Sequence, residues 1–179
     1  MQKIKQKSLF LQWGKGTDGV TAVEFSLVAF PFLLMVIGII ELALMFAAAN
    51  ILEGAVGDAT RIIRTGQVQQ SGSGEQMFQD ALCNHAAALI NCANVQYNVV
   101  ELSSFSDADN QQNQFDENGN MINSQFSPSG SSTVVMVRVS YLYPLITPLI
   151  GNFFADQPDN KRLLVSTAVF EVEPYQFTP

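Results

Sequence analysis

The sequence predicts an α+β protein in which one long N-terminal helix, membrane-spanning in its first half, packs on a small antiparallel β-sheet. Three observations predict it. An uncharged apolar run lies near the N-terminus, apolar residues continue at helical spacing beyond that run, and later segments have the composition and alternation of β-strands. Hydrophobic residues make up 47% of the 179-residue chain and charged residues only 14%. Charged residues ordinarily make up about 25%, so the composition also indicates a membrane segment.

The apolar run is long enough to cross a bilayer. No charge occurs from Phe25 to Ile40, and a weakly polar stretch from Val20 to Ala49 is interrupted only by Glu24 and Glu41. A hydrocarbon core of about 30 Å needs about 20 apolar residues. The basic residues upstream, which orient the N-terminus to the cytoplasm, are Lys3, Lys5, Lys7 and Lys15.

Charge and composition divide the chain into three parts. We expect a basic cytoplasmic leader at 1–19, a helix at 20–66 that spans the membrane in its first half, and a periplasmic α+β domain at 67–179 with a flexible loop at 103–132. The first 19 residues carry four lysines and one aspartate, and the rest of the chain carries five basic and fifteen acidic residues. An acidic body repels nucleic acid, so nucleic-acid binding is not expected.

Three kinds of segment fit the apolar run. A cleaved secretory signal has a shorter apolar region, although Ala47 to Ala49 offers a small-residue cleavage site. A plain uncleaved signal anchor leaves Glu24 unexplained, because a carboxylate in such a segment costs about 2–3 kcal/mol without a partner. The third kind follows from Gly19 to Phe25, which resembles the processing site of type IV-like prepilins.

That resemblance implies cleavage after Gly19, which leaves Val20 as the N-terminus and Glu24 as the fifth residue. In those proteins the glutamate is thought to offset the free amine of a neighbouring subunit. The alternative is that Glu24 extends to the membrane surface. Pro31 removes a helical hydrogen bond and should kink the segment. For Glu41 we favour a carboxylate that reaches the headgroups, with a contact to a partner subunit as the alternative.

Beyond the membrane the helix continues to about Thr65, with Gly66 as a C-terminal cap. A polar linker at 67–74 precedes a short helix at 75–90. Strands are expected at 95–102, 133–143 and 163–172. An apolar, proline-containing connection at 144–154 joins the last two, and Asn118-Gly119 favours a tight turn within the loop at 103–132.

Few residues suggest chemistry. In an oxidising periplasm Cys83 and Cys92 predict one disulfide, with two free thiols as the alternative. The acidic stretch 116–120 lacks the spacing of a calcium loop and favours a solvated turn. His85 is the only histidine and is more consistent with a structural role. No metal, cofactor or catalytic residue is expected, and the chain is predicted not to be an enzyme.

Taken together, the chain resembles the TadE-like pseudopilins, or minor pilins, of the tight-adherence (Flp) pilus system. The resemblance lies in the segment 19–25 with its apolar helix, in the helix end 59–67, in the cysteine pair, and in the tail 166–175. Two features depart from the major pilins of that system. Phe25 stands where they usually have tyrosine after the glutamate, and this chain is far longer.

The resemblance implies a pilin-like fold and a non-enzymatic minor subunit that initiates or supports pilus assembly for surface adherence. It implies as partners a prepilin peptidase, other pilin and pseudopilin subunits, an inner-membrane platform with its secretion ATPase, and membrane lipid. Gly19 and Val20 would flank the cleavage, and Glu24 and Phe25 would contact other subunits. The rival function is a membrane-anchored periplasmic binding module or adhesin unrelated to pili. An anchored periplasmic enzyme is a weaker rival.

Overall fold

The computed structural model describes residues 19–111, 115–128, 130–147, 151 and 153–174. Residues 1–18 of the basic leader expected at 1–19, and part of the apolar connection, lie outside the described residues. The described chain divides into two compact units, one ending at Ile40 and the other beginning at Glu41.

One helix, α2, runs from Val20 to Arg64 and contributes to both units. It contains a stretch long and apolar enough to cross a membrane, with a mean hydropathy of 2.6, and it is the one such helix among the described residues. Pro31 lies inside it. Arg61 and Arg64 occupy its last turn, and Gly66 adopts a left-handed φ of 75° just beyond its end. A glycine without a Cβ adopts this conformation at low cost, so the chain can turn away there.

Two further helices follow in the second unit. The segment 67–74, which we expected to be a polar linker, contains the single-turn helix α3 (Gln67–Gln70). The next helix, α4, spans Gly74–Ala86 and ends before the predicted Ile90. A turn at 87–91 and the 3₁₀ turn η2 (Cys92–Asn94) then lead into the sheet.

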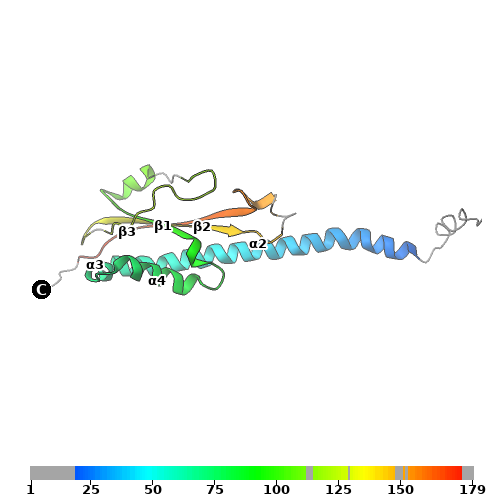
Figure 1. Ribbon diagram of the computed structural model, residues 1–179, viewed down its shortest axis with the longest axis horizontal. Coiled ribbons are helices and arrows are strands. Elements are labelled where there is room, and N and C mark those ends of the chain that lie inside the picture. Colours follow the sequence, from blue (N-terminus) through cyan, green and yellow to red (C-terminus); the bar gives the residue numbers. More distant parts are fainter. Residues whose placement is uncertain (1–18, 112–114, 129, 148–150, 152, 175–179) are drawn as a thin grey trace, which may run out of the picture. The chain divides into compact units, whose positions relative to one another are not determined.

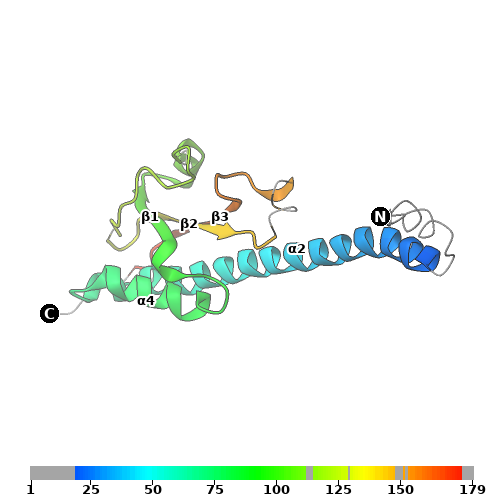
Figure 2. The same ribbon diagram turned by 45° about the vertical axis from the view of Figure 1, so that its right-hand side comes forward.

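The sheet has three antiparallel strands in the order β1 (Val95–Leu102), β2 (Val134–Pro144) and β3 (Lys161–Glu171). Val95 pairs with Tyr141, and Pro144 pairs with Lys161. The predicted α+β class is therefore confirmed. Figures 1 and 2 show the second unit as layers, with the helices along one face of the sheet and the 103–132 segment along the other.

The core lies between the helices and the sheet. Alternate residues of β2 are buried on this side, as the sequence predicts. They meet fully buried side chains of α2 and α4, among them Leu52, Ile63, Phe78 and Leu82. These contacts involve only α2 residues after Glu41, so the second unit uses the later half of the helix as a structural element.

The other face of the sheet is also partly covered. Met136 is fully buried there with Val100 and Leu102, and Ala108 of the 3₁₀ helix η3 (Phe105–Asn110) packs against them. Further along the same segment, Val99 forms backbone hydrogen bonds with Gln125 and Ser127. The loop at 103–132 is thus held against the sheet at defined points, while its predicted flexibility remains a prediction.

Candidate functional site

The candidate assembly site is the start of α2. The helix begins at Val20, directly after Gly19, and both residues are exposed. A Cβ placed on Gly19 would meet no atom within 4 Å. Val20 and Glu24 are four residues apart and therefore lie on the same face of the helix, one turn from each other.

Glu24 is exposed in the described chain, as is Phe25, of which 74% of the surface is accessible. The apolar side chains around them are equally open. Val23 and Leu27 are 59% and 71% exposed, and Phe30 is 66% exposed. A surface this apolar requires contact with lipid or with other protein chains. Glu24 therefore lies at the beginning of a segment that is stable only in such surroundings.

Glu41 lies at the beginning of the second unit, and its position differs from our expectation. The residue is only 3% exposed, and its carboxylate is enclosed rather than extended toward headgroups. It accepts hydrogen bonds from the Ile146 backbone N–H and from the Thr147 hydroxyl, each at 2.9 Å. The preferred interpretation of Glu41 was therefore wrong: this residue fastens the connection between β2 and β3 to α2.

An apolar cavity of about 430 Å³ opens beside this contact. Its lining includes Leu44 of α2, the turn 87–91, and Tyr141, Tyr143, Pro144 and Ile146. Burial raises the pKa of Tyr143, and repulsion from the Glu41 carboxylate adds to the effect. Tyr143 is therefore neutral at physiological pH.

The predicted cysteine pair is a disulfide. Cys83 of α4 and Cys92 of η2 are bonded, with 5.8 Å between their Cα atoms. The bond closes the turn 87–91 that lines the cavity. Next to it, the Asn91 backbone N–H donates a hydrogen bond of 3.3 Å to the Tyr141 hydroxyl, which ties the same turn to β2.

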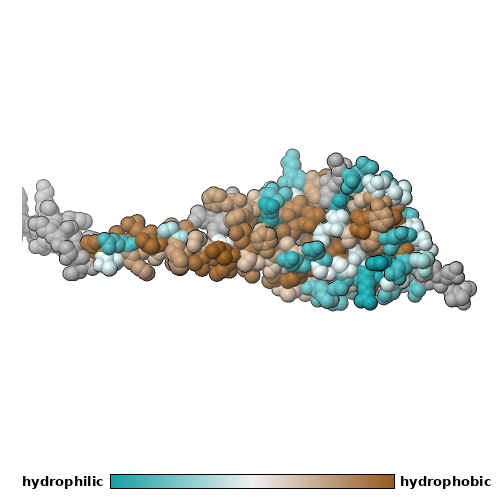
Figure 3. Space-filling model, turned by 180° about the vertical axis from the view of Figure 1, so that it is seen from behind, coloured by the Kyte–Doolittle hydropathy of each residue, from teal (hydrophilic) through white to brown (hydrophobic). Residues whose placement is uncertain are grey.

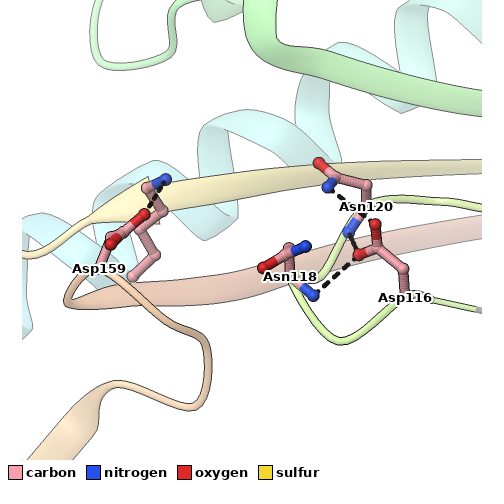
Figure 4. Close-up of polar contacts among 5 residues, drawn as sticks. Asp116, Asn118, Asn120 and Asp159 are labelled. Carbon is pink, nitrogen blue, oxygen red and sulfur yellow. Dashed lines mark hydrogen bonds and ion pairs between the residues drawn. The ribbon is translucent and has the colours of Figure 1, made fainter.

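The acidic stretch 116–120 is a turn that binds its own backbone (Figure 4). The Asp116 carboxylate accepts hydrogen bonds from the N–H groups of Asn118 (2.9 Å) and Asn120 (2.7 Å) and from the Asn120 side-chain amide (3.1 Å). Hydrogen bonds from Asn120 lower the pKa of Asp116. Gly119 has a left-handed φ of 77°, and a Cβ there would lie 2.7 Å from Gln157. This geometry agrees with the solvated turn.

Elsewhere in the described part of the chain, some charged residues of the helices form ion pairs. His85 lies 3.2 Å from Asp58 of α2, and Arg64 lies 3.4 Å from Glu173. Among the described residues, no three His, Cys, Asp or Glu side chains converge in a way that could hold a metal ion.

Comparison with known protein families finds a match in the N-terminal part of the chain. Residues 19–61 match the family model described as TadE-like protein. The matched range begins at the glycine before α2 and includes Val20, Glu24, Phe25, Pro31 and Glu41. No curated protein and no solved structure matches the chain.

The match agrees with the resemblance seen in the sequence and suggests a protein associated with the tight-adherence pilus system. An apolar N-terminal helix that is long enough to cross a membrane fits a membrane-anchored protein. The sequence did not predict the two hydrogen bonds of Glu41. Their donors lie more than 100 residues away in a proline-containing connection, and no local pattern marks such a pair.

Proposed function

We propose that this chain is a non-enzymatic minor pilin, or pseudopilin, that initiates or supports assembly of tight-adherence pili for surface adherence. The observation that carries the proposal is the arrangement at 19–25: an exposed glycine, a helix that begins at the next residue, and a carboxylate one turn later, all within the TadE-like match. Proteins of this kind are pilus components rather than enzymes.

In this proposal a prepilin peptidase cuts between Gly19 and Val20. The new α-amine has a pKa near 8 in model peptides and is mostly protonated at neutral pH. Glu24 of one subunit then offsets the amine of a neighbouring pilin or pseudopilin, and Phe25 packs in the same contact. Pro31 bends the helix between them and the second unit. A buried carboxylate costs least when it meets a positive charge, which gives Glu24 a reason to occupy an apolar segment.

The proposed topology follows the charges. The lysine-bearing leader stays in the cytoplasm, α2 crosses the inner membrane once, and the second unit lies in the periplasm or enters the pilus. The disulfide between Cys83 and Cys92 supports an oxidising compartment for that unit. An inner-membrane platform and its secretion ATPase would move the subunit from lipid into the filament.

N-terminal sequencing of the protein isolated from membranes tests cleavage. We expect Val20 as the first residue. A chain that begins at Asn50 indicates an ordinary signal peptide, and an intact Met1 indicates a plain anchor; either result rejects the pilin function.

The role of Glu24 has a test of its own. Glu24→Ala should leave membrane insertion unchanged and reduce the number of pili, because it removes the counter-ion but no apolar surface. Glu53→Ala is the matched control, since Glu53 is an exposed glutamate on the same helix. Unchanged piliation in Glu24→Ala cells contradicts the role. An adhesin unrelated to pili would instead lose surface binding when 103–132 is deleted, with filaments still present.

A further inference from the structure

We propose that the second unit carries a membrane-contact surface of its own, which inserts into the headgroup–acyl boundary of the bilayer beside the point where α2 emerges. We call it the basal surface; it comprises the first turns of α2 after Glu41, the turn 87–91 and the described residues of the connection after Pro144, at 145–147, 151 and 153–155. The inference rests on the membrane span of the proposed function and adds a second, peripheral contact to it.

The first argument is position along the chain. From Val20 to Ile40, α2 rises about 31 Å at 1.5 Å per residue, which matches the hydrocarbon core. Glu41, the next residue, holds the backbone N–H of Ile146 at 2.9 Å. Glu41 directly follows the span, and its side chain binds Ile146. In any orientation of the second unit, Ile146 therefore lies no farther from the end of the span than the length of one glutamate side chain.

The second argument is exposure. Ile146 is 72% exposed, Leu89 of the turn 87–91 is 38% exposed, and Phe46 of α2 is 62% exposed. Phe153, which belongs to the same connection as Ile146, is 84% exposed. The cavity of about 430 Å³ between the turn and the connection is mainly lined by apolar residues. Leu89 and Ile146 line the same cavity, and large apolar side chains that remain exposed beside each other indicate a contact surface.

The third argument is the absence of charge. The described residues that build the basal surface, at 42–52, 87–91, 145–147, 151 and 153–155, include no Asp, Glu, Lys, Arg or His. The chain as a whole has a net charge of −7, and its acidic residues lie outside these segments. An acidic unit approaches an anionic bilayer most easily through a charge-free surface, because desolvating and repelling carboxylates would oppose contact.

The rim of the surface has the polarity expected at headgroup level. Lys161 and Arg162 begin β3 and pair in register with Pro144 and Tyr143. Each lies near an aspartate, at 3.4 Å for Lys161 and 3.3 Å for Arg162. Long basic side chains and tyrosines are suited to the membrane–water interface because one end is apolar and the other polar. Figure 3 shows hydrophobic residues in several patches on the surface of the second unit, with hydrophilic residues between and around them.

The turn 87–91 is built to keep its apolar residues in place. The disulfide between Cys83 and Cys92 closes it on both sides, and the Asn91 N–H bonds to Tyr141. Glu41 does the same for the connection. Two independent constraints therefore hold the exposed apolar residues of the turn and of the connection in place.

Tryptophan quenching by brominated lipids tests the proposal on the full chain, which is reconstituted in lipid vesicles without any other pilus protein. The native Trp13 is replaced by phenylalanine, and one tryptophan is placed at Leu89 or at Ile146. The control is Phe105→Trp, because Phe105 is 55% exposed and follows the far end of β1. We expect bromines near the headgroup end of the acyl chain to reduce fluorescence at 89 and 146, at a depth of about 5–10 Å, and to leave 105 unchanged.

Leu33→Trp separates failure of this inference from failure of the membrane span. If Leu33→Trp is quenched by bromines near the chain terminus while positions 89 and 146 behave like 105, the span stands and the basal surface does not contact lipid. That result overturns the inference and assigns the surface to a protein partner. If none of the four positions is quenched, the span itself is rejected, and the inference with it.

Discussion

Removing the Glu41 carboxylate should loosen the connection between β2 and β3. Glu41 is only 3% exposed, and its carboxylate accepts two hydrogen bonds of 2.9 Å, from Ile146 and Thr147. A hydrogen bond to a charged group contributes about 1.5–3 kcal/mol, and an orphaned buried donor costs about 1–3 kcal/mol. Because the ionised group also has an unfavourable desolvation energy that the substitution relieves, we expect Glu41→Ala to destabilise the second unit by about 3 kcal/mol.

Glu41→Gln should cost less. Its amide oxygen can still accept from the Ile146 N–H, and its amide nitrogen can donate to the Thr147 hydroxyl, which is both donor and acceptor. Both contacts survive without the charge, so the loss should be about 1 kcal/mol. For a unit of this size each kcal/mol lowers the melting temperature by about 3 °C, which predicts decreases of about 9 °C for alanine and about 3 °C for glutamine.

The assay is thermal unfolding of the full chain in nanodiscs, followed by near-ultraviolet circular dichroism, with amide hydrogen exchange at Ile146 measured in parallel. Exchange at that amide should accelerate most in Glu41→Ala. Glu53→Ala is the control, because it removes an exposed carboxylate from the same helix. If Glu41→Ala melts no lower than this control and the Ile146 amide stays protected, the hydrogen bonds do not hold the connection and the reasoning fails.

Three further predictions concern local structure. Gly66→Ala should destabilise the fold by about 1–2 kcal/mol, because the backbone φ at this position is 75°. Gly54→Ala, in the exposed interior of α2, should instead stabilise the fold by about 0.5–1 kcal/mol. Chemical denaturation measures both changes. Replacing Cys83 and Cys92 together with alanine should cost about 2–3 kcal/mol, and stability equal to the oxidised protein would contradict this. Because the pKa of Asp116 is lowered from 3.8 in the folded state, its contribution to stability is fully present above pH 3.8 and is lost as the pH falls through the folded-state pKa. A carboxyl-carbon NMR titration of the folded protein with a midpoint at or above 3.8 would refute this prediction.

Elements with a strong repeating pattern were predictable from the sequence. The strand β1 coincides with the predicted 95–102, because its β-branched residues are bounded by turns. The strand β2 differs from its prediction by one residue at each end. The long helix ends at Arg64, since Gly66 marks the stop. In these cases a few neighbouring residues determine the outcome, and the sequence contains all of them.

Contacts between distant segments were not predictable in the same way. Arg138 and Ser140 alternate with the apolar residues of β2, so alternation alone predicts a polar, exposed face for them, yet Ser140 is only 2% exposed. On the same face Met136 is fully buried beneath η3. That burial depends on how the Ser/Asn/Gln-rich segment 103–132 returns over the sheet, and its composition alone favours a loop. Glu41 was misread for the same reason, because its donors are remote in sequence.

The two halves of α2 require different surroundings. In the second unit Leu52 and Ile63 are almost completely buried, so packing already satisfies that half. Before Glu41, large apolar residues are exposed on all sides, among them Val20, Val23, Phe25, Leu27, Val28, Phe30, Phe32, Leu33, Met35, Ile37, Ile39 and Ile40. Removing such side chains from water gains about 1.5–3 kcal/mol each, so the segment as a whole gains on the order of 20 kcal/mol from an apolar environment.

That gain decides how the Glu24 experiment should be interpreted. A carboxylate in the span costs about 2–3 kcal/mol, roughly a tenth of what the apolar residues gain. Glu24 therefore cannot decide whether α2 enters the membrane, and its replacement should not alter insertion. Under the proposed function it would decide where the helix goes next, because lipid and a bundle of pilin helices are both apolar and differ mainly in whether they offer a positive partner. A small electrostatic term between two otherwise similar environments is enough to direct a subunit from one to the other.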